Sequence, residues 1–326
     1  MPDRPRLTPA VADIRRAVRA ALPESGVVLV GLSGGPDSLA LAAATAFEAS
    51  RAGVRAGAVV VDHGLQAGSE AVAERAAAQA RDLGLDPVTV VQVEVGAEGG
   101  PEAAARTARY AALDAAAAEL DGIVLLGHTL DDQAETVLLG LARGSGPASL
   151  QGMAQASGVY RRPLLGIRRS TTRQACVDAG LEPWDDPQNE DPAFTRVRVR
   201  TAVLPVLEAE LGPGVAEALA RTAELLREDA EALDGFAEEV AEDLAEHIEA
   251  GLALPVAALA SNPPALRQRL IRLAVSSEFG VALSRAQTLE VARLVTNWHG
   301  QAGVDLPGVM VVRRGGMLSF HAKTPS

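Results

Sequence analysis

A short segment rich in serine and glycine, Ser33-Gly34-Gly35-Pro36-Asp37-Ser38, joins an apolar run at 27–32 to an alanine-rich stretch that begins at Leu39. A strand that runs through a glycine-rich turn into a helix directs backbone N–H groups and the positive end of the helix dipole at one point. The segment therefore predicts a phosphate-binding site. The structural alternative is a strand-to-helix turn in which Asp37 caps the helix.

Asp37 is the unexpected residue of this segment, because a carboxylate repels phosphate unless a cation lies between them. We therefore expect Asp37 to hold Mg²⁺ beside a polyphosphate. Two common nucleotide-binding motifs are excluded. A Walker loop needs a lysine near its end, and Lys323 is the only lysine in the chain. The dinucleotide fingerprint needs glycines at G-x-G-x-x-G spacing, which this segment lacks.

Apolar runs alternate with helical patterns in the first half of the chain, which predicts an α/β fold with a parallel sheet and helices on both faces. We expect strands at 27–32, 58–61, 88–95 and 123–126, and helices at 40–50, 69–83 and 102–120. Polar or glycine-rich residues follow the four strands at Ser33, Asp62-His63-Gly64, Gly96 and Gly127-His128. Because ligands bind beyond the carboxyl ends of parallel strands, these segments should converge on one crevice.

Acidic residues follow the fourth predicted strand, in the segment 127–136. Asp132 and Glu135 are three residues apart and share a face if this segment is helical, so together they could hold an ammonium group or a metal. Capping of the helix by Asp131 and Asp132 is the alternative. The sequence does not distinguish Asp131 from Asp132 as the more important acid.

Basic residues complete the candidate site. Arg109 lies on one predicted helix with Glu102 and Arg106, and an arginine in an ATP site can neutralise charge that develops on phosphate. A surface ion pair between Glu102 and Arg106 is the alternative for this motif. His63 follows the second strand, where it could contact a ligand or only hydrogen-bond its own loop.

The chain has 326 residues, of which 48% are hydrophobic and 22% charged, so it is long enough for two globular domains. A polar N-terminus and the lack of a long apolar segment predict a cytoplasmic protein that contacts no membrane. The single cysteine, Cys176, permits no intramolecular disulfide and no cysteine-ligated cluster. We expect a catalytic domain over 1–205 and a smaller, mainly helical module over 206–326, with a strand pair at 309–312 and 317–321.

The net charge of −12 is unevenly distributed. Residues 206–250 contain 14 acidic residues against two arginines, whereas residues 251–326 contain eight basic residues against three acidic ones. A protein with an acidic helix and separate arginine clusters can still bind RNA along its basic faces. Solvation of the helices is the alternative explanation for any one cluster.

Together these segments resemble the bacterial tRNA(Ile)-lysidine synthetases, a family of the N-type ATP pyrophosphatase (PP-loop) superfamily. Besides the loop, the resemblance rests, in unbroken order, on Asp62–Leu65, Glu102–Tyr110, Gly127–Thr136, Leu141–Gly146, Arg162–Leu165 and Trp184–Asn189. The chain departs from the family pattern at Asp62, Ala142, Gln188 and Val197.

The resemblance implies a PP-loop fold and a ligase that forms a carbon–nitrogen bond. Such enzymes use ATP and Mg²⁺ to adenylate the 2-carbonyl oxygen of the wobble cytidine in tRNA(Ile) with a CAU anticodon. The ε-amine of free L-lysine then displaces AMP to form lysidine. By resemblance, the residues that bind the nucleotide are Ser33, Gly34, Gly35, Pro36, Asp37, Ser38, His63, Gly127 and His128. The catalytic residues are Asp37, Arg109, Asp132 and Glu135, of which the last two would bind the lysine ammonium.

The tRNA partner would be held by arginines. The candidates are Arg161, Arg162, Arg168, Arg169, Arg173, Arg196, Arg198 and Arg200 near the site, and Arg267, Arg269, Arg272, Arg313 and Arg314 in the C-terminal module. A tRNA thiolase of the same superfamily is a rival interpretation, which the single cysteine disfavours. A non-catalytic protein that binds ATP or RNA is another. The sequence leaves the oligomeric state open, and a homodimer is one alternative.

Overall fold

The computed structural model describes residues 7–64, 66, 68–94, 96, 100–144, 146–244, 246–248 and 251–323. The motif positions Leu65 and Ser145, the predicted strand end at Val95 and the side chain of Glu102 lie outside the described residues. The chain divides into two compact units, Met1–Glu224 (unit 1) and Leu225–Ser326 (unit 2). No helix in the described ranges has the length and apolar character needed to cross a membrane.

Unit 1 contains a six-stranded sheet in the order β3-β2-β1-β4-β6-β5. Its strands are β1 (Val27–Leu32), β2 (Arg55–Asp62), β3 (Val88–Gln92), β4 (Gly122–Leu126), β5 (Ala156–Ser157) and β6 (Tyr160–Arg161). The pairs β1–β2, β1–β4, β2–β3 and β4–β6 are parallel, and only β5 pairs in antiparallel fashion. The four predicted strands are therefore confirmed, with β2 longer and β3 shorter than expected.

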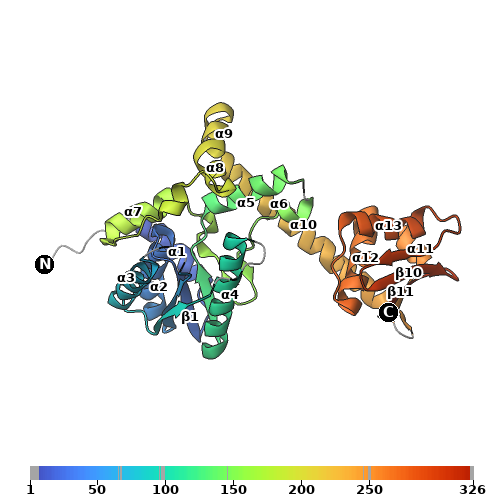
Figure 1. Ribbon diagram of the computed structural model, residues 1–326, viewed down its shortest axis with the longest axis horizontal. Helices are drawn as coiled ribbons and strands as arrows, with labels where there is room; N and C mark the ends of the chain where they lie inside the picture. The colour runs from blue at the N-terminus through green and yellow to red at the C-terminus, as the bar shows by residue number, and fades with distance from the viewer. Residues whose placement is uncertain are drawn as a thin grey trace. The chain divides into compact units, whose positions relative to one another are not determined.

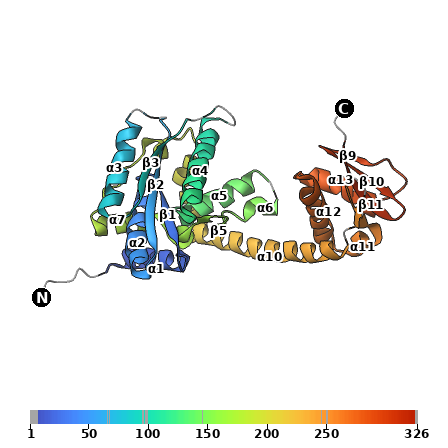
Figure 2. The same cartoon turned by 90° about the horizontal axis from the view of Figure 1, so that it is seen from below.

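Helices cover both faces of this sheet, as predicted. The helices of unit 1 are α1 (Pro9–Ala21), α2 (Pro36–Ala52), α3 (Ser69–Asp82), α4 (Pro101–Leu120), α5 (Leu130–Ala142), α6 (Pro147–Leu150), α7 (Arg169–Ala179), α8 (Thr195–Arg198), α9 (Leu204–Leu211) and the first part of α10 (Val215–Leu244). Two 3₁₀ turns, η1 (Pro163–Gly166) and η2 (Pro187–Glu190), and a π-helical segment, η3 (Val199–Val203), connect them. In Figure 2 the strands β1, β2 and β3 stand between α3 and α4.

Side-chain alternation along β1 explains the two layers. Val28 and Val30 are buried with α1, α2, α3 and α7, whereas Leu29 is buried with Leu113 of α4 on the other face. Because successive side chains of a strand point to opposite faces, a strand covered on both sides is apolar throughout. The continuous apolar run at 27–32 is therefore the signature of a central strand.

The segment from Thr195 to Leu211 is one helical path whose middle, η3, has π-helical geometry. Pro205 lies two residues after η3 and has no backbone N–H to donate to residue 201, which favours a change of helical register there. Pro205 therefore lies within a helical path, and the boundary expected near it falls inside unit 1. Leu204 and Ala216, on either side of that boundary, share a hydrophobic cluster with Leu130 of α5.

Unit 2 combines helices with a small antiparallel sheet (orange and red in Figure 1). The sheet order is β7-β8-β11-β10-β9, with strands β7 (Glu246–Ile248), β8 (Gly251–Pro255), β9 (Val304–Leu306), β10 (Val309–Arg314) and β11 (Met317–Ala322). Its other helices are α11 (Val256–Ser261), α12 (Pro264–Phe279) and α13 (Arg285–Thr296). The predicted strand pair is confirmed as β10 and β11, whereas β7, β8 and β9 were not predicted.

Candidate active site

A cavity of about 650 Å³ lies at the carboxyl ends of the central strands of unit 1. Three of the four predicted segments converge on it, whereas Gly96, after β3, is not among its lining residues. The candidate residues that line it are Ser33, Gly35, Pro36, Asp37, Ser38, His63, Arg109, Gly127, His128 and Asp132. Gly34 and Glu135, also candidates, are not among the lining residues.

The loop after β1 is held in shape by its own serines. The Ser33 backbone N–H donates to Ser38 Oγ at 3.2 Å, and Ser38 Oγ donates to the Gly35 carbonyl at 3.0 Å. Gly34 has a φ of 82°, a conformation that favours glycine. A Cβ atom at Gly127 would lie 3.1 Å from the Ser38 backbone nitrogen, so the loop after β4 approaches this loop closely. The N-terminal end of α2 lies directly after this loop, an arrangement that suits an anion because helix N-termini present free backbone N–H groups.

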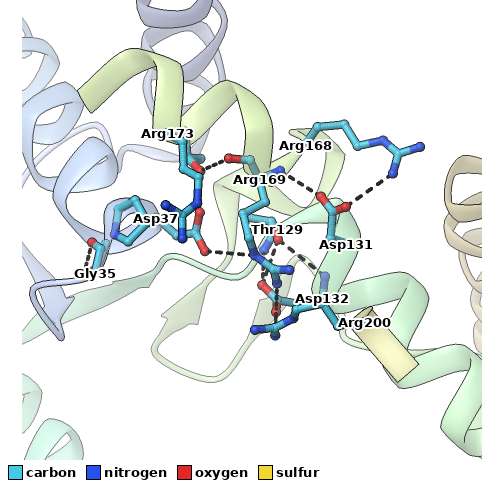
Figure 3. A network of polar contacts seen from close by, with 12 residues as sticks. Gly35, Asp37, Thr129, Asp131, Asp132, Arg168, Arg169, Arg173 and Arg200 are labelled. Carbon is cyan, nitrogen blue, oxygen red and sulfur yellow. Dashed lines mark hydrogen bonds and ion pairs between the residues drawn. The ribbon is translucent and has the colours of Figure 1, made fainter. Parts of the chain in front are cut away.

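Asp37 is tied to α7 through both carboxylate oxygens, and Figure 3 shows its contact with Arg169. Oδ1 accepts a hydrogen bond from the Thr172 hydroxyl, and Oδ2 lies 3.5 Å from Arg169 Nε. The Asp37 side chain is 22% exposed. Burial raises the pKa of Asp37 above its usual value, although Thr172 and Arg169 favour the charged form.

Asp131 and Asp132 point in different directions (Figure 3). Asp131 accepts from the Arg169 backbone N–H at 2.7 Å, at the start of α7, and pairs with Arg168 at 3.3 Å. Asp132 forms a capping box with Thr129 at the start of α5 and also lies 2.6 Å from an Arg169 side-chain nitrogen. Of the two acids, only Asp132 lines the cavity.

The pKa of Asp132 depends on its buried position and on the groups that contact it. Burial alone would raise this pKa, but Arg169 and the hydrogen bonds from Thr129 outweigh burial and lower it below its usual range. Asp132 is therefore a carboxylate anion at neutral pH. The structure thus separates a structural acid, Asp131, from an acid that faces the cavity.

Glu135 has no exposed side-chain surface and contacts three arginines. Arg200 Nε lies 2.7 Å from Glu135 Oε1, Arg169 Nη1 lies 3.3 Å from the same oxygen, and Arg196 Nε lies 3.4 Å from Oε2. These arginines come from η3, α7 and α8. The carboxylate pair expected to hold an ammonium group therefore lies within a cluster whose cations are arginines of the chain itself.

Arg109, His63 and His128 line another part of the cavity. Burial lowers the pKa of Arg109, and Arg106 adds to this effect by charge repulsion. Burial also lowers the pKa of His63, with a further contribution from Arg109. The Nδ1 atoms of both histidines are buried without a hydrogen-bond partner among the described residues. This part of the cavity offers one cation and two neutral imidazoles to a ligand.

Known proteins resemble this chain along most of its length. A model of the PP-loop domain matches residues 9–207, and a model of the TilS substrate binding domain matches residues 254–319. The tRNA(Ile)-lysidine synthase of Leifsonia xyli subsp. xyli (strain CTCB07) is 66% identical over 305 residues, which cover 93% of this chain and 92% of that one. The chain belongs to the tRNA(Ile)-lysidine synthase family.

Other members of the tRNA(Ile)-lysidine synthase family are also similar along nearly the whole chain. The enzyme of Thermobifida fusca (strain YX) is 55% identical over 313 residues, covering 94% of this chain and 95% of its own. Among solved structures, the U34-tRNA thiolase NcsA from Methanococcus maripaludis, described with its [4Fe-4S] cluster, has a TM-score of 0.57 and 20% identity. It covers 67% of this chain and 78% of that one, and the likeness shows a shared fold.

Several residues of this lysidine synthase family site were assigned differently, or not at all, by sequence reasoning. Arg169, Arg196 and Arg200 are candidates for contact with tRNA, and in the structure each also pairs with a carboxylate of the site. Arg168 pairs with Asp131, Glu208 and Glu217, and so links α5, α9 and α10 within unit 1. Thr172 was not predicted at all. The sequence showed where the arginines lie along the chain, but only the fold reveals which carboxylate each one meets.

The neutral state of His128 makes the stability of this lysidine synthase family member depend on pH. Burial lowers the pKa of His128 to about 4; Asp132 opposes this effect, and Arg162 and Arg109 add to it. In the unfolded chain the pKa of a histidine is about 6.5. Below that pH the unfolded chain binds a proton at His128 that the folded chain does not bind, so the protein becomes less stable as the pH decreases.

We expect His128 to contribute a loss of about 2 kcal/mol between pH 7 and pH 5. Denaturant unfolding of the wild type and of His128→Gln across this range measures the contribution, and the variant should lose less stability. The exposed His299 supplies the control variant, His299→Gln, which should behave as the wild type. Identical pH profiles for His128→Gln and the wild type would contradict the neutral assignment.

Proposed function

We propose that this chain is a tRNA(Ile)-lysidine synthase that adenylates the wobble cytidine of tRNA(Ile) and then joins the ε-nitrogen of lysine to C2 of that base. The observation that carries the proposal is one cavity, in a chain of this family, that brings together a phosphate-binding loop, Asp37, Arg109 and the carboxylate Asp132. A phosphate site beside a cation and an anionic site is what adenylation followed by amine attack requires.

Mg²⁺ fits the residues around Asp37. This ion commonly binds one or two protein carboxylates together with substrate phosphates. Asp37 lies in the loop and lines the cavity, and no cluster of three or more His, Cys, Asp or Glu side chains suited to a metal occurs in the described part of the chain. Asp37 would hold the ion, with phosphate and water as its remaining ligands. When bound, the ion would offset the charge of the departing pyrophosphate.

ATP would bind with its phosphates on the Ser33–Ser38 loop. There the loop N–H groups would orient the α-phosphorus toward the 2-carbonyl oxygen of the cytidine, and that oxygen would displace pyrophosphate. Arg109 carries a charge that burial disfavours, so a phosphate beside it would relieve this cost. His63, Gly127 and His128 would form the remaining wall of the nucleotide site.

Lysine would approach from the side of Asp132. We propose that Asp132 receives the ammonium group and assists its deprotonation, since only the neutral amine can attack C2 and expel AMP. Glu135 is fully buried, so its part would be to fix Arg169 and Arg200, which also contact Asp132, rather than to contact lysine directly.

We expect Asp132→Asn to raise the lysine KM about tenfold or more, because a hydrogen bond to a charged group is worth about 1.5–3 kcal/mol. Asparagine keeps an oxygen that can accept from Thr129, which preserves the cap of α5. The matched control is Asp131→Asn, which should weaken the start of α7 and leave the lysine KM unchanged. Steady-state kinetics with saturating ATP and tRNA measures both values, and an unchanged KM in Asp132→Asn would refute the assignment.

Unit 2 would bind a part of the tRNA other than the anticodon base that reacts in unit 1, a role supported by the match to the TilS substrate binding domain. Three of the arginines proposed for this role also have local partners. Arg267 donates to the Leu259 carbonyl, Arg269 pairs with Asp234, and Arg313 donates to the Leu294 carbonyl. The exposed Arg314 and the half-buried Arg272 are therefore the better candidates for contact with phosphate.

The decisive test incubates the purified protein with ATP, Mg²⁺, radiolabelled lysine and a tRNA(Ile) transcript with a CAU anticodon, alongside an initiator methionine tRNA with the same anticodon. Label in the isoleucine tRNA alone is the expected result. Formation of AMP without label in either RNA would indicate another nucleophile or carbonyl substrate. If neither AMP nor labelled RNA formed, the non-catalytic alternative would stand.

A further inference from the structure

One face of α7 packs on the first turn of α2, directly after the phosphate-binding loop. Arg169, Thr172 and Cys176 are spaced by three and four residues, which places them on one side of this helix. Arg169 Nε lies 3.5 Å from Asp37 Oδ2, the Thr172 hydroxyl contacts Asp37 Oδ1, and Cys176 Sγ donates to the Pro36 carbonyl at 3.3 Å. Three successive contacts therefore bind α7 to the turn that carries Asp37.

Thr172 is completely buried, and its hydroxyl has two acceptors within reach. One is Asp37 Oδ1 and the other is the Arg169 carbonyl, at 2.8 Å. A hydroxyl has one proton to donate. The Arg169 carbonyl belongs to α7, where the backbone N–H four residues later is its regular donor. The Asp37 carboxylate is charged and largely buried, so a hydrogen bond from the Thr172 hydroxyl stabilises it more than it stabilises the Arg169 carbonyl.

From these contacts we infer that Thr172 is a positioning residue for Asp37. The Thr172 hydroxyl donates to Oδ1 of Asp37 and so limits the rotation of the carboxylate group, while Arg169 holds Oδ2. Ala175 and Cys176, three and four residues further along the same helix, are buried as well. The inference rests on the proposed role of Asp37 in holding Mg²⁺ and ATP, and it assigns no contact between Thr172 and substrate.

The test compares Thr172→Val, which keeps the shape and removes the hydroxyl, with Thr172→Ser, which keeps the hydroxyl. Thr171→Val is the matched control, because Thr171 is the adjacent threonine and is not among the Asp37 contacts. Two readouts apply. One is equilibrium binding of adenosine 5′-[α,β-methylene]triphosphate with Mg²⁺ by calorimetry, since this analogue cannot be cleaved at the α,β position. The other is lysidine formation at varied Mg²⁺.

We expect Thr172→Val to bind the Mg²⁺–analogue complex about tenfold more weakly and to need correspondingly more Mg²⁺ for half-maximal lysidine formation. Thr172→Ser should recover most of both losses, and Thr171→Val should match the wild type. Equal affinity in Thr172→Val and the wild type would overturn the inference, as would an equal loss in the serine and valine variants at unchanged melting temperature. A wild type that binds the analogue but forms no lysidine would refute the proposed function, while the binding series would still test Thr172.

Discussion

Replacement of Asp37 by asparagine is expected to reduce lysidine formation roughly a thousandfold. Stabilisation of phosphate charge by a metal is worth several kcal/mol in the transition state, and each 1.36 kcal/mol is a factor of ten in rate. Asparagine keeps the size of the side chain and an oxygen that can accept from Thr172, but it removes the negative charge that would hold Mg²⁺. Single-turnover release of pyrophosphate from ATP, with tRNA(Ile) in excess, measures the effect on the first step.

Stability supplies the control for this variant. Burial raises the pKa of Asp37, so at neutral pH the folded protein bears a cost for its ionised form. Asp37→Asn should therefore melt at or above the temperature of the wild type. Release of pyrophosphate at the wild-type rate in Asp37→Asn would contradict the role of Asp37. A large drop in melting temperature would contradict our account of its environment.

Replacement of Glu135 by alanine is expected to destabilise unit 1 by about 3–5 kcal/mol. Removal of one partner from a buried ion cluster leaves the opposite charges uncompensated, which costs more than the cluster itself contributes. Here Arg169, Arg196 and Arg200 would share a site from which their fully buried anion is gone. Asp132 could still pair with Arg169 and Arg200, so Arg196 is the arginine whose ion pair would be lost without replacement.

Denaturant unfolding followed by circular dichroism measures this change. Glu210→Ala is a suitable control, because Glu210 is an exposed acid on α9 and its replacement should alter stability by no more than about 0.5 kcal/mol. The double variant Glu135→Ala/Arg196→Ala should recover part of the loss, since it removes one unpaired cation. If Glu135→Ala were as stable as Glu210→Ala, the buried cluster would not stabilise the fold.

Elements with strong local signals were predictable from the sequence. The central strand at 27–32 is apolar throughout, and the helix after the loop begins at Pro36, a residue suited to a first turn. The convergence of Ser33, His63 and His128 on one cavity followed from the parallel sheet, in which strand ends meet at one edge. The short strands β7, β8 and β9 escaped prediction because three to five residues carry too little periodicity.

By itself, the sequence determined the fold class, the turn from the first strand into a helix at 33–38 and the family to which the motifs belong, because each depends on patterns of residues close together in the chain. Tertiary structure alone decided which of Asp131 and Asp132 lines the cavity, since the two residues are of the same type and adjacent in the chain. Helix α7 starts beside α5, so Asp131 caps α7 while Asp132 meets the Arg169 side chain. Such pairings join residues more than thirty positions apart, and no local pattern encodes which partner the fold brings near.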